Sequence, residues 1–354
     1  MANETRVREP LWLLVNRSIM RICLIPKVHG VGGMVSFQAK LTAGLTARGI
    51  QVSDDPSRLD YDAVLITGGT RDIPALLRLR RRGVRIVQRL DGINWLHRRV
   101  YTGPRHFLRA EYGNRLLALL RARVVTRIVY QSDFVRGWWG RQFGPERVPS
   151  VVIYNGVDLS VYTPTGPQGR PSDRFRLLLV EGSLQGGYET GMSTAIDLAA
   201  GLSLTFPLEL VVAGRLSPEQ EAEYQAKSRV PITWAGLIPR DAIPALDRSA
   251  HLLYSADLNA ACPNSVIEAL ACGLPVAGFA TGALPELVTG DSGRLVPYGG
   301  DPWKLDPPAV PALVEAAREI RQDQPRFRRA ARQRAEEAFG LDQMVDRYLA
   351  IMLG

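Results

Sequence analysis

The chain has 354 residues, of which 46% are hydrophobic and 22% charged, and its formal net charge is +9. This composition is typical of a folded globular protein and excludes a disordered or fibrous one. The three cysteines have neither paired nor metal-ligand spacing, and no apolar run reaches the roughly 18 residues of a membrane-spanning helix. We therefore expect a cytoplasmic protein without disulfide bonds.

Residues 1–18 are expected to form an N-terminal extension, because their one apolar run is too short for the core of a signal peptide. From residue 19 onward, short apolar runs alternate with segments of helical periodicity. Such runs are typical of strands buried in a parallel sheet. In the first half, the predicted strands are 19–26, 62–67, 84–90, 127–131 and 151–154, and the predicted helices pass through 37–45, 73–79 and 116–120.

The second half repeats this alternation. Its predicted strands include 176–180, 208–213 and 274–279, and its predicted helices include 191–203 and 263–272. A stretch rich in proline and glycine, 163–171, separates the two halves and is typical of a linker. We therefore predict an α/β protein with two doubly wound, Rossmann-like domains built on parallel sheets.

The helix predicted at 263–272 carries the pattern that is most indicative of chemistry. Pro263 suits a first helical position, Gly273 ends the helix, and Asn264 and Glu268 share one face. A helix that begins at the carboxyl edge of a parallel sheet presents free N–H groups to an anion. The carboxylate of Glu268 has two acceptor oxygens, enough for the neighbouring hydroxyls of a ribose. The alternative is a surface glutamate on a helix that packs in the core.

Four segments together resemble the retaining glycosyltransferases of family 4, which have the GT-B architecture. They are GG at 32–33, SDFV at 132–135, YNGVD at 154–158 and VIEALACGLPV at 266–276. The likeness covers nearly the whole chain, and the last two motifs are specific. It implies two Rossmann-like domains whose parallel sheets face each other across a cleft.

The resemblance also implies an enzyme, a retaining glycosyltransferase of hexosyltransferase type. It would move a sugar from a UDP- or GDP-linked donor to an acceptor hydroxyl, without a metal ion or another cofactor. The acceptor domain would comprise 19–165 and a C-terminal helix at about 336–354, and the donor domain would comprise 172–335. Glu268 would hold the nucleotide ribose. The residues that would approach the donor phosphates or sugar are Asn264, Ser265 and Val266.

The chain departs from the family pattern at two places in the donor domain. The family has a sugar-binding glutamate eight residues before the ribose glutamate, where this chain has Ala260, with Asp257 and Asn259 as candidate substitutes. The arginine and lysine that clamp the diphosphate after the first strand of that domain are also absent. We expect backbone N–H groups and Arg215 to replace them, the alternatives being a simple turn and a surface arginine. The loop residues concerned are Gly182, Ser183, Gly186 and Gly187.

On the acceptor side, Gly32 and Gly33 either let the backbone approach the donor or form only a tight turn between strand and helix. Asp91 either accepts a hydrogen bond from a sugar hydroxyl, with Arg89 as its partner, or caps a turn. Asp91 and Glu268 are the candidate catalytic residues. The candidate acceptor-side residues are His29, Arg89, Asp91 and Asn94.

The sequence shows no Ser/His/Asp elbow motif, no metal-spaced histidine pair and no Walker loop. The mechanism implied by the resemblance is front-face displacement, in which the leaving diphosphate helps to take the acceptor proton. The protein would then position the substrates and stabilise the diphosphate charge. Two alternatives stay open: a non-catalytic protein that binds nucleotide sugars, and a sugar-nucleotide epimerase.

Positive charge is concentrated in residues 71–147, which hold 18 arginines, no lysine and 5 acidic residues. Arginines interleaved with Trp95, Trp138, Trp139 and Phe143 suit an anionic membrane surface, whereas solvated arginines and core tryptophans are the alternative. The first reading predicts a peripheral position on the inner face of the membrane and a lipid-linked saccharide as acceptor. We expect no nucleic-acid partner, because no recognisable reading module accompanies the charge.

Overall fold

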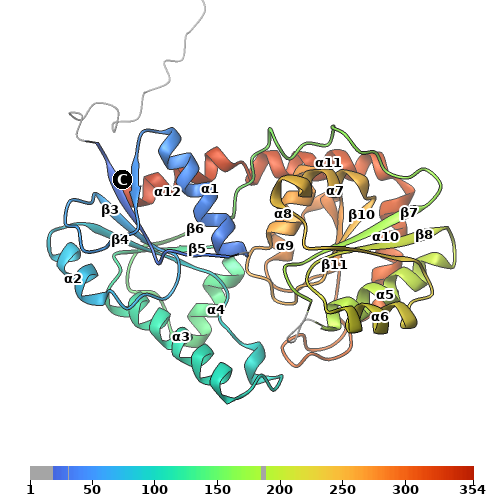
Figure 1. Ribbon diagram of the computed structural model, residues 1–354, viewed down its shortest axis with the longest axis horizontal. Helices are drawn as coiled ribbons and strands as arrows, with labels where there is room; N and C mark the ends of the chain where they lie inside the picture. Colours follow the sequence, from blue (N-terminus) through green and yellow to red (C-terminus); the bar gives the residue numbers. More distant parts are fainter. Residues whose placement is uncertain (1–18, 31, 185–188) are drawn as a thin grey trace, which may run out of the picture.

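The computed structural model describes residues 19–30, 32–184 and 189–354, which form two six-stranded parallel sheets (Figure 1). The first sheet has the order β2-β1-β3-β4-β5-β6 and the second the order β12-β11-β10-β7-β8-β9. The strands of the first sheet are β1 (Arg21–Ile25), β2 (Gln51–Ser53), β3 (Ala63–Ile66), β4 (Arg85–Leu90), β5 (Arg127–Tyr130) and β6 (Ser150–Val152). Those of the second are β7 (Phe175–Val180), β8 (Leu208–Ala213), β9 (Ile232–Gly236), β10 (Leu252–Ser255), β11 (Val276–Phe279) and β12 (Gly293–Val296).

Helices cover both faces of the first sheet. One face carries α1, and the other carries α2, α3 and α4. The strands between them are apolar because both of their faces are buried, and β3 has no solvent exposure at all. The helical segments are α1 (Gly33–Ala47), α2 (Ile73–Arg81), η2 (Leu96–Arg98), α3 (Pro104–Arg123) and α4 (Asp133–Phe143).

The second sheet is covered in the same way. Side chains of α5, α6 and α10 pack on one face, and those of α8, α9 and α11 pack on the other. The first helical segments of this half are α5 (Glu189–Ser203), α6 (Pro218–Lys227), η3 (Arg240–Ala242) and α7 (Ile243–Ser249). The next are α8 (Asn264–Ala271), α9 (Leu284–Leu287), η4 (Gly290–Ser292), α10 (Val310–Gln322) and α11 (Gln324–Ala338).

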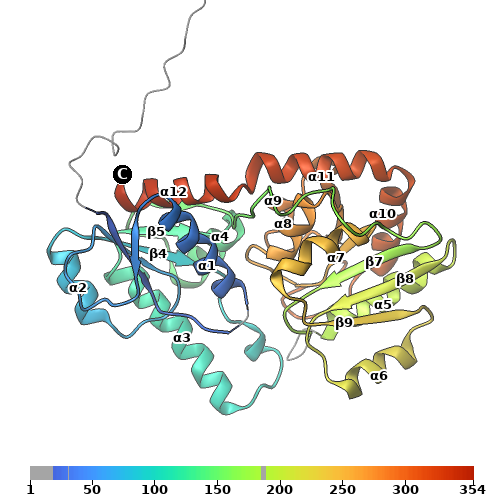
Figure 2. The same ribbon diagram turned by 45° about the horizontal axis from the view of Figure 1, so that its top comes forward.

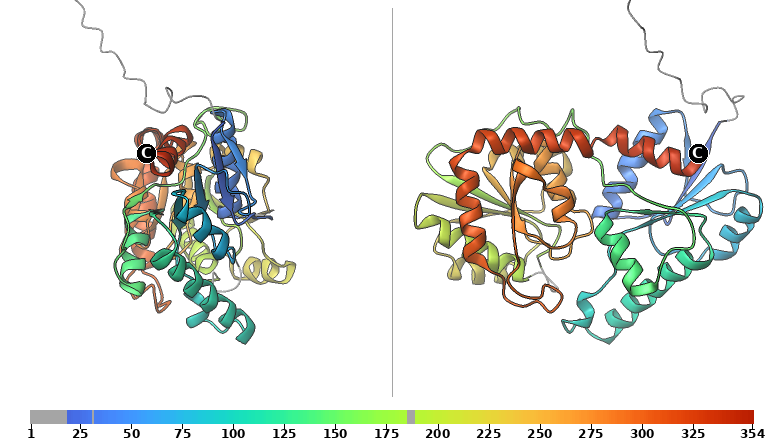
Figure 3. Two further views of the ribbon diagram at one scale, coloured as in Figure 1. Left: turned by 90° about the vertical axis from the view of Figure 1, so that its left-hand side faces the viewer. Right: turned by 180° about the vertical axis from the view of Figure 1, so that it is seen from behind.

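The last helix returns the chain to the first domain. Figures 2 and 3 show α11 lying along the second domain and α12 (Leu341–Leu353) crossing to the first. Val345 and Tyr348 of α12 enter the same core as α1. Gly44 makes this close packing possible, because a Cβ there would lie only 2.5 Å from Val345. The core of the first domain is therefore completed by the C-terminus.

The strand orders locate the functional edges of both sheets. The order reverses beside β1 in the first sheet and beside β7 in the second. At such switch points, neighbouring connections leave toward opposite faces and a crevice opens at the carboxyl ends of the strands. The loop from β1 to α1 and the loop from β7 to α5 border these crevices.

The predicted fold class, two doubly wound domains on parallel sheets, is confirmed. The helix expected around 116–120 is longer than predicted and begins at Pro104, because its first turns are rich in arginine and carry no apolar periodicity. The edge strand β2 has no counterpart among the predicted strands, since its three residues are too few to form a recognisable run. In the described part of the chain, no helix is both long and apolar enough to span a bilayer.

Candidate active site

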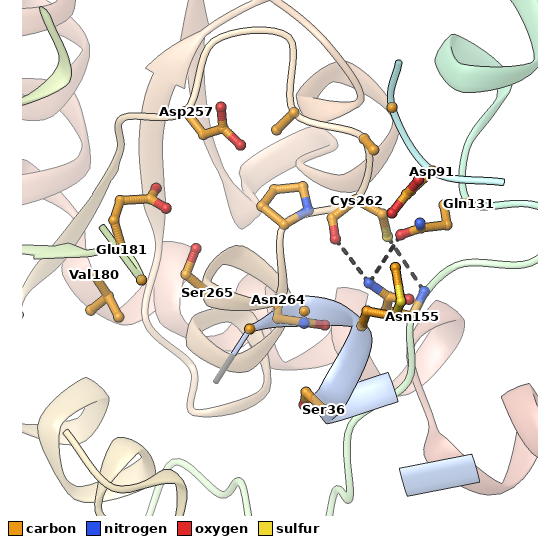
Figure 4. A pocket seen from close by; sticks show the side chains of 18 of the residues that line it. Ser36, Asp91, Gln131, Asn155, Val180, Glu181, Asp257, Cys262, Asn264 and Ser265 are labelled. Carbon is orange, nitrogen blue, oxygen red and sulfur yellow. Dashed lines mark hydrogen bonds between the residues drawn. The ribbon is translucent and has the colours of Figure 1, made fainter. Parts of the chain in front are cut away.

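A cleft of about 1040 Å³ lies between the two domains (Figure 4). The first domain lines it with residues within 30–36 and 89–106, and the second with residues within 180–182, 237–243 and 257–268. These segments follow the carboxyl ends of strands in both sheets, where parallel α/β proteins bind their ligands. The volume is at the upper end of the range for small-molecule sites.

Two helices begin at this cleft from opposite walls. Gly33 starts α1 and Asn264 starts α8, and a Cβ built on Gly33 would lie 3.6 Å from Asn264 Nδ2. Among the residues that the structure describes, no side chain caps the first N–H groups of either helix. Gly32 allows the approach on one side, because its φ of 145° is strained for any other residue. The amides and the dipoles of both helices favour negative charge at this point of the cleft.

The predicted donor-binding residues divide into two groups. The cleft is lined by Gly32, Gly33, Gly182, Asn264, Ser265 and Glu268. Val266 is fully buried in the core of the second domain, because the helical period turns it away from the face that carries Asn264 and Glu268. Ser183 does not line the cleft. Gly186 and Gly187 lie outside the described residues.

The expectation for Arg215 is corrected by its position. This residue follows β8 with an exposed side chain and does not line the cleft. Arg240, in η3 after β9, is an exposed arginine that does line it. Sequence reasoning missed Arg240, because no local signal distinguishes it from the other surface arginines of the chain.

Glu268 lies on the cleft side of α8 with only 11% of its side chain exposed. Its Oε1 accepts a hydrogen bond of 3.1 Å from Lys40 Nζ. Lys40 belongs to α1, so this ion pair joins the two domains. Sequence reasoning also missed Lys40, because the two residues are 228 positions apart in the chain.

Two carboxyl groups line the donor side of the cleft. Glu181 follows β7 and Asp257 follows the neighbouring strand β10 (Figure 4). Burial raises the pKa of Asp257 to about 7. Burial, reinforced by the charge of Asp257, also raises the pKa of Glu181. Burial therefore favours the neutral, protonated form of both carboxyl groups, and that form repels a bound anion less than the charged one does.

The position of the missing sugar-binding glutamate, Ala260, lies in the cleft wall and is 3% exposed. Asn259 beside it is also buried and has a left-handed φ of 57°, a conformation that asparagine tolerates better than most residues. Its Nδ2 has no hydrogen-bond partner within the described segments. Both proposed substitutes, Asp257 and Asn259, thus border the cleft.

The predicted acceptor-side residues Arg89, Asp91 and Asn94 line the opposite wall, whereas His29 is exposed and does not line it. Burial raises the pKa of Asp91, and the positive charge of Arg89 opposes this shift. No ion pair forms between them. Instead, Arg89 donates to Asn155 Oδ1 at 2.9 Å and stacks on Phe37 at 3.8 Å. Arg89 therefore supports the cleft floor.

The acceptor-side wall contains further polar groups that were not predicted. His97, Thr102 and His106 line the cleft next to Asn94. His97 Nε2 lies 2.9 Å from Glu111 Oε1. A hydrogen bond from Arg98, and to a lesser extent one from His97, lowers the pKa of Glu111 to about 2. The sequence carries only a weak signal for these residues, because isolated polar side chains are usually solvated.

Hydrogen bonds between the domains hold the base of the cleft. Asn155 Nδ2 donates to the carbonyl of Cys262 at 2.9 Å, as Figure 4 shows. Ser132 Oγ donates to the carbonyl of Ala261 at 2.7 Å. The motifs SDFV and YNGVD thus supply two of the residues of the first domain that contact the second.

Among the described residues, no group of three or more His, Cys, Asp or Glu side chains is arranged to hold a metal ion. The cysteines Cys23, Cys262 and Cys272 are free and buried.

Residues 176–326 match the model of the family described as "Glycosyl transferases group 1". This segment covers most of the second domain. A stretch of 85 residues is 32% identical to the 2-deoxystreptamine N-acetyl-D-glucosaminyltransferase of Streptomyces fradiae. That stretch is 24% of this chain and spans only 20% of the length of that curated relative.

Solved structures resemble nearly the whole chain. Sucrose-phosphate synthase from Thermosynechococcus elongatus has a TM-score of 0.69 at 17% identity, with 94% of this chain and 98% of that one covered. HepE of Anabaena, in complex with UDP and glucose, has a TM-score of 0.64 at 17% identity, with the same coverage. WaaG, a glycosyltransferase involved in lipopolysaccharide biosynthesis, has a TM-score of 0.67 at 16% identity, with 95% and 100% covered. The chain has the GT-B fold.

Proposed function

We propose that the protein is a retaining glycosyltransferase that moves a sugar from a UDP- or GDP-linked donor to an acceptor hydroxyl. The observation that carries the proposal is the pair of uncapped helix N-termini, at Gly33 and Asn264, which meet across a cleft beside Glu268. A nucleotide sugar presents a diphosphate next to a ribose, which matches this pairing of anion site and carboxylate. The group 1 glycosyl transferase match of residues 176–326 supports the same class of reaction.

In this proposal other groups replace the absent arginine and lysine clamp. The N–H groups at the starts of α1 and α8 bind the diphosphate, and Arg240 adds positive charge from the wall of the second domain. Glu268 accepts hydrogen bonds from the ribose hydroxyls. The carboxyl groups of Glu181 and Asp257 bind hydroxyls of the donor sugar in place of the residue that is Ala260 here.

The reaction then proceeds by front-face displacement. The acceptor oxygen bonds to the anomeric carbon as the bond between that carbon and the diphosphate oxygen breaks, and the leaving diphosphate takes the proton of the acceptor hydroxyl. The helix dipoles stabilise the charge that develops on the diphosphate. Asp91 and Asn94 orient the acceptor from the first domain. The protein accelerates transfer by holding the two substrates close together.

The test is incubation with a panel of UDP- and GDP-sugars, with and without a membrane extract, followed by measurement of free nucleotide. We expect release of free nucleotide that requires the extract. If the donor sugar is α-linked, NMR of the product should also show an α linkage. Glu268→Gln should raise the donor KM by about tenfold, since one charged hydrogen-bond acceptor is lost. Conversion of the donor alone would indicate an epimerase, and binding without turnover a non-catalytic protein.

We also propose that the acceptor is lipid-linked and that α3 contacts an anionic membrane. Trp138 and Trp139 are buried in the core, so the predicted indole contacts are corrected. Instead, α3 exposes Leu108, Tyr112 and Leu119 on one helical face together with four arginines. Those arginines are Arg105, Arg109, Arg115 and Arg123. Apolar side chains between arginines suit a headgroup layer.

Co-sedimentation with vesicles tests this second proposal. Binding to vesicles of phosphatidylcholine with 30% phosphatidylglycerol should exceed binding to phosphatidylcholine alone by at least tenfold. Leu108→Glu should reduce it several-fold, because a charge would replace an apolar side chain that is 69% exposed. Leu204→Glu is the matched control, since Leu204 is 79% exposed on the second domain. Equal binding to both vesicle types would contradict the proposal.

A further inference from the structure

Lys40 reaches from α1 of the first domain to Glu268, a residue of the cleft wall in the second domain. Its Nζ donates to Glu268 Oε1 at 3.1 Å and to the carbonyl of Gly156 at 3.1 Å, and it lies 5.9 Å from the centre of the Tyr162 ring. These three partners come from α8 and from the segment that joins the domains. One ammonium group is therefore fixed by two different parts of the chain, through three partners.

This lysine differs from the other three in the protein. The side chains of Lys27, Lys227 and Lys304 are 60–65% exposed and pair with acidic residues close in sequence or on the surface. The side chain of Lys40 is 12% exposed. Exposed ion pairs such as those of the other three lysines contribute little to stability. A partly buried pair such as that of Lys40 fixes the geometry of both groups.

We propose that Lys40 is a positioning residue for donor binding: it holds the Glu268 carboxylate in the orientation that receives the 2′- and 3′-hydroxyls of the nucleotide ribose. The inference rests on the proposed function of Glu268. Lys40 occupies Oε1, while Oε2 has no hydrogen-bond partner in the part of the chain that the structure describes. A carboxylate oxygen has two acceptor sites, so both oxygens can still take a hydroxyl.

The surroundings of Glu268 explain why a cation is needed there. Asp247 of α7 is 1% exposed. Burial raises the pKa of Asp247 most, and the negative charge of Glu268 raises it further. A second carboxyl group thus lies close to Glu268 in a buried region. Without Lys40, the Glu268 carboxylate would have no cationic hydrogen-bond partner among the described residues. Because an unpaired buried charge is costly, the side chain would turn out of the ribose-binding position.

The ion pair also links the donor site to the relative position of the domains. Lys40 and Glu268 belong to different domains, so they are 3.1 Å apart only while the cleft has its present width. The site for the ribose is therefore complete only when α1 and α8 face each other. That arrangement is also the one that brings the two helix N-termini together.

The experiment compares nucleotides that differ only in the 2′-hydroxyl. The dissociation constants of UDP and 2′-deoxy-UDP, and of GDP and 2′-deoxy-GDP, are measured by calorimetry for the full chain and its variants. The wild-type protein should bind the ribonucleotide of its preferred base at least tenfold more tightly, because a charged hydrogen bond is lost with the hydroxyl. Glu268→Gln should reduce this ratio to about two or less.

Lys40→Met keeps the length of the apolar stem and removes the charge. It should lower the ratio to that of Glu268→Gln, and the double variant should lower it no further. Lys40→Arg should retain most of the ratio. Lys227→Met, which removes a lysine from an exposed pair on α6, should retain all of it. Since the ratio is internal to each variant, a smaller folded fraction does not alter it.

The possible failures are distinguishable. A wild-type protein that does not discriminate between the two sugars would overturn the ribose role of Glu268 and with it the proposed function of this site. A wild-type protein that discriminates, combined with a Lys40→Met variant that keeps the full ratio, would overturn the role of Lys40 alone.

Discussion

Single residues of the donor wall have properties that depend on their neighbours in space. Glu181 and Asp257 are 76 positions apart in the chain, yet they end adjacent strands and face the same cleft. Burial raises the pKa of Asp257 to about 7 and also raises that of Glu181. Asp257 therefore changes its charge near neutral pH, which makes this wall of the cleft sensitive to pH.

This sensitivity predicts a stability effect for Asp257→Asn. A folded-state pKa above that of the unfolded chain means that the unfolded state loses its proton first, so stability falls as the pH rises from about 4 to about 7. Asparagine has no charge to bury. The free energy of unfolding of the variant minus that of the wild type should therefore be larger at pH 8 than at pH 5, by on the order of 2 kcal/mol. Urea unfolding at both pH values measures this, and an equal difference at the two values would refute it.

At the scale of the elements, the helices at the domain boundary are capped in different ways. The first amides of α1 and α8 have no side-chain cap, which leaves them for a ligand. The start of α4 is capped from the other domain: Glu286 of α9 accepts from the amides of Asp133 at 2.8 Å and Phe134 at 2.6 Å. The capped helix therefore helps to join the domains, and the other two begin at the wall of the cleft.

Glu286→Gln should weaken this junction. The amide oxygen of glutamine can accept one of the two hydrogen bonds but lacks the charge that favours a helix N-terminus. We expect a loss of about 1–2 kcal/mol in the free energy of unfolding, measured with urea. Glu223→Gln is the control, because Glu223 belongs to an exposed ion pair on α6. Losses of the same size in both variants would contradict a role for Glu286 between the domains.

The whole molecule is held together by contacts between its two halves in addition to α12. Trp303, from the loop between β12 and α10, packs into the core of the first domain. Its ring centre lies 4.8 Å from that of Trp138 and 5.1 Å from that of Trp95. Aromatic pairs at such distances add to the burial of apolar area. Because Trp95 and Trp138 also line the cleft, this contact between the domains lies beside the cleft.

Trp303→Ala should therefore loosen the arrangement of the domains. Removing a half-buried tryptophan should cost about 2 kcal/mol, and the loss falls on the contact between the domains. Small-angle X-ray scattering without ligand should show a larger radius of gyration than the wild type. Phe206→Ala is the control, since Phe206 packs on Phe175 within the second domain. Unchanged scattering of the Trp303 variant would show that other contacts suffice to hold the domains.

Local patterns in the sequence determined the fold class and part of the site. A buried strand such as β3 was predictable because a strand covered on both faces is predominantly apolar. The start of α8, with Asn264 and Glu268 on one face, was predictable from helical spacing alone. The same spacing makes Val266 point inward, which the motif did not reveal.

The tertiary structure alone decided which distant residues meet at the cleft and at the contacts between the domains. Lys40, Arg240 and Glu286 have no local signal of function, because a charged residue on a helix or loop is usually solvated. Their roles arise where elements of two domains approach, through contacts such as the pair of Lys40 with Glu268, 228 positions further along the chain. Periodicity is a property of neighbours in sequence, and electrostatic partnership is a property of neighbours in space. The sequence by itself therefore determined the two domains and one wall of the donor site, and only the folded chain decided which charges meet across the cleft.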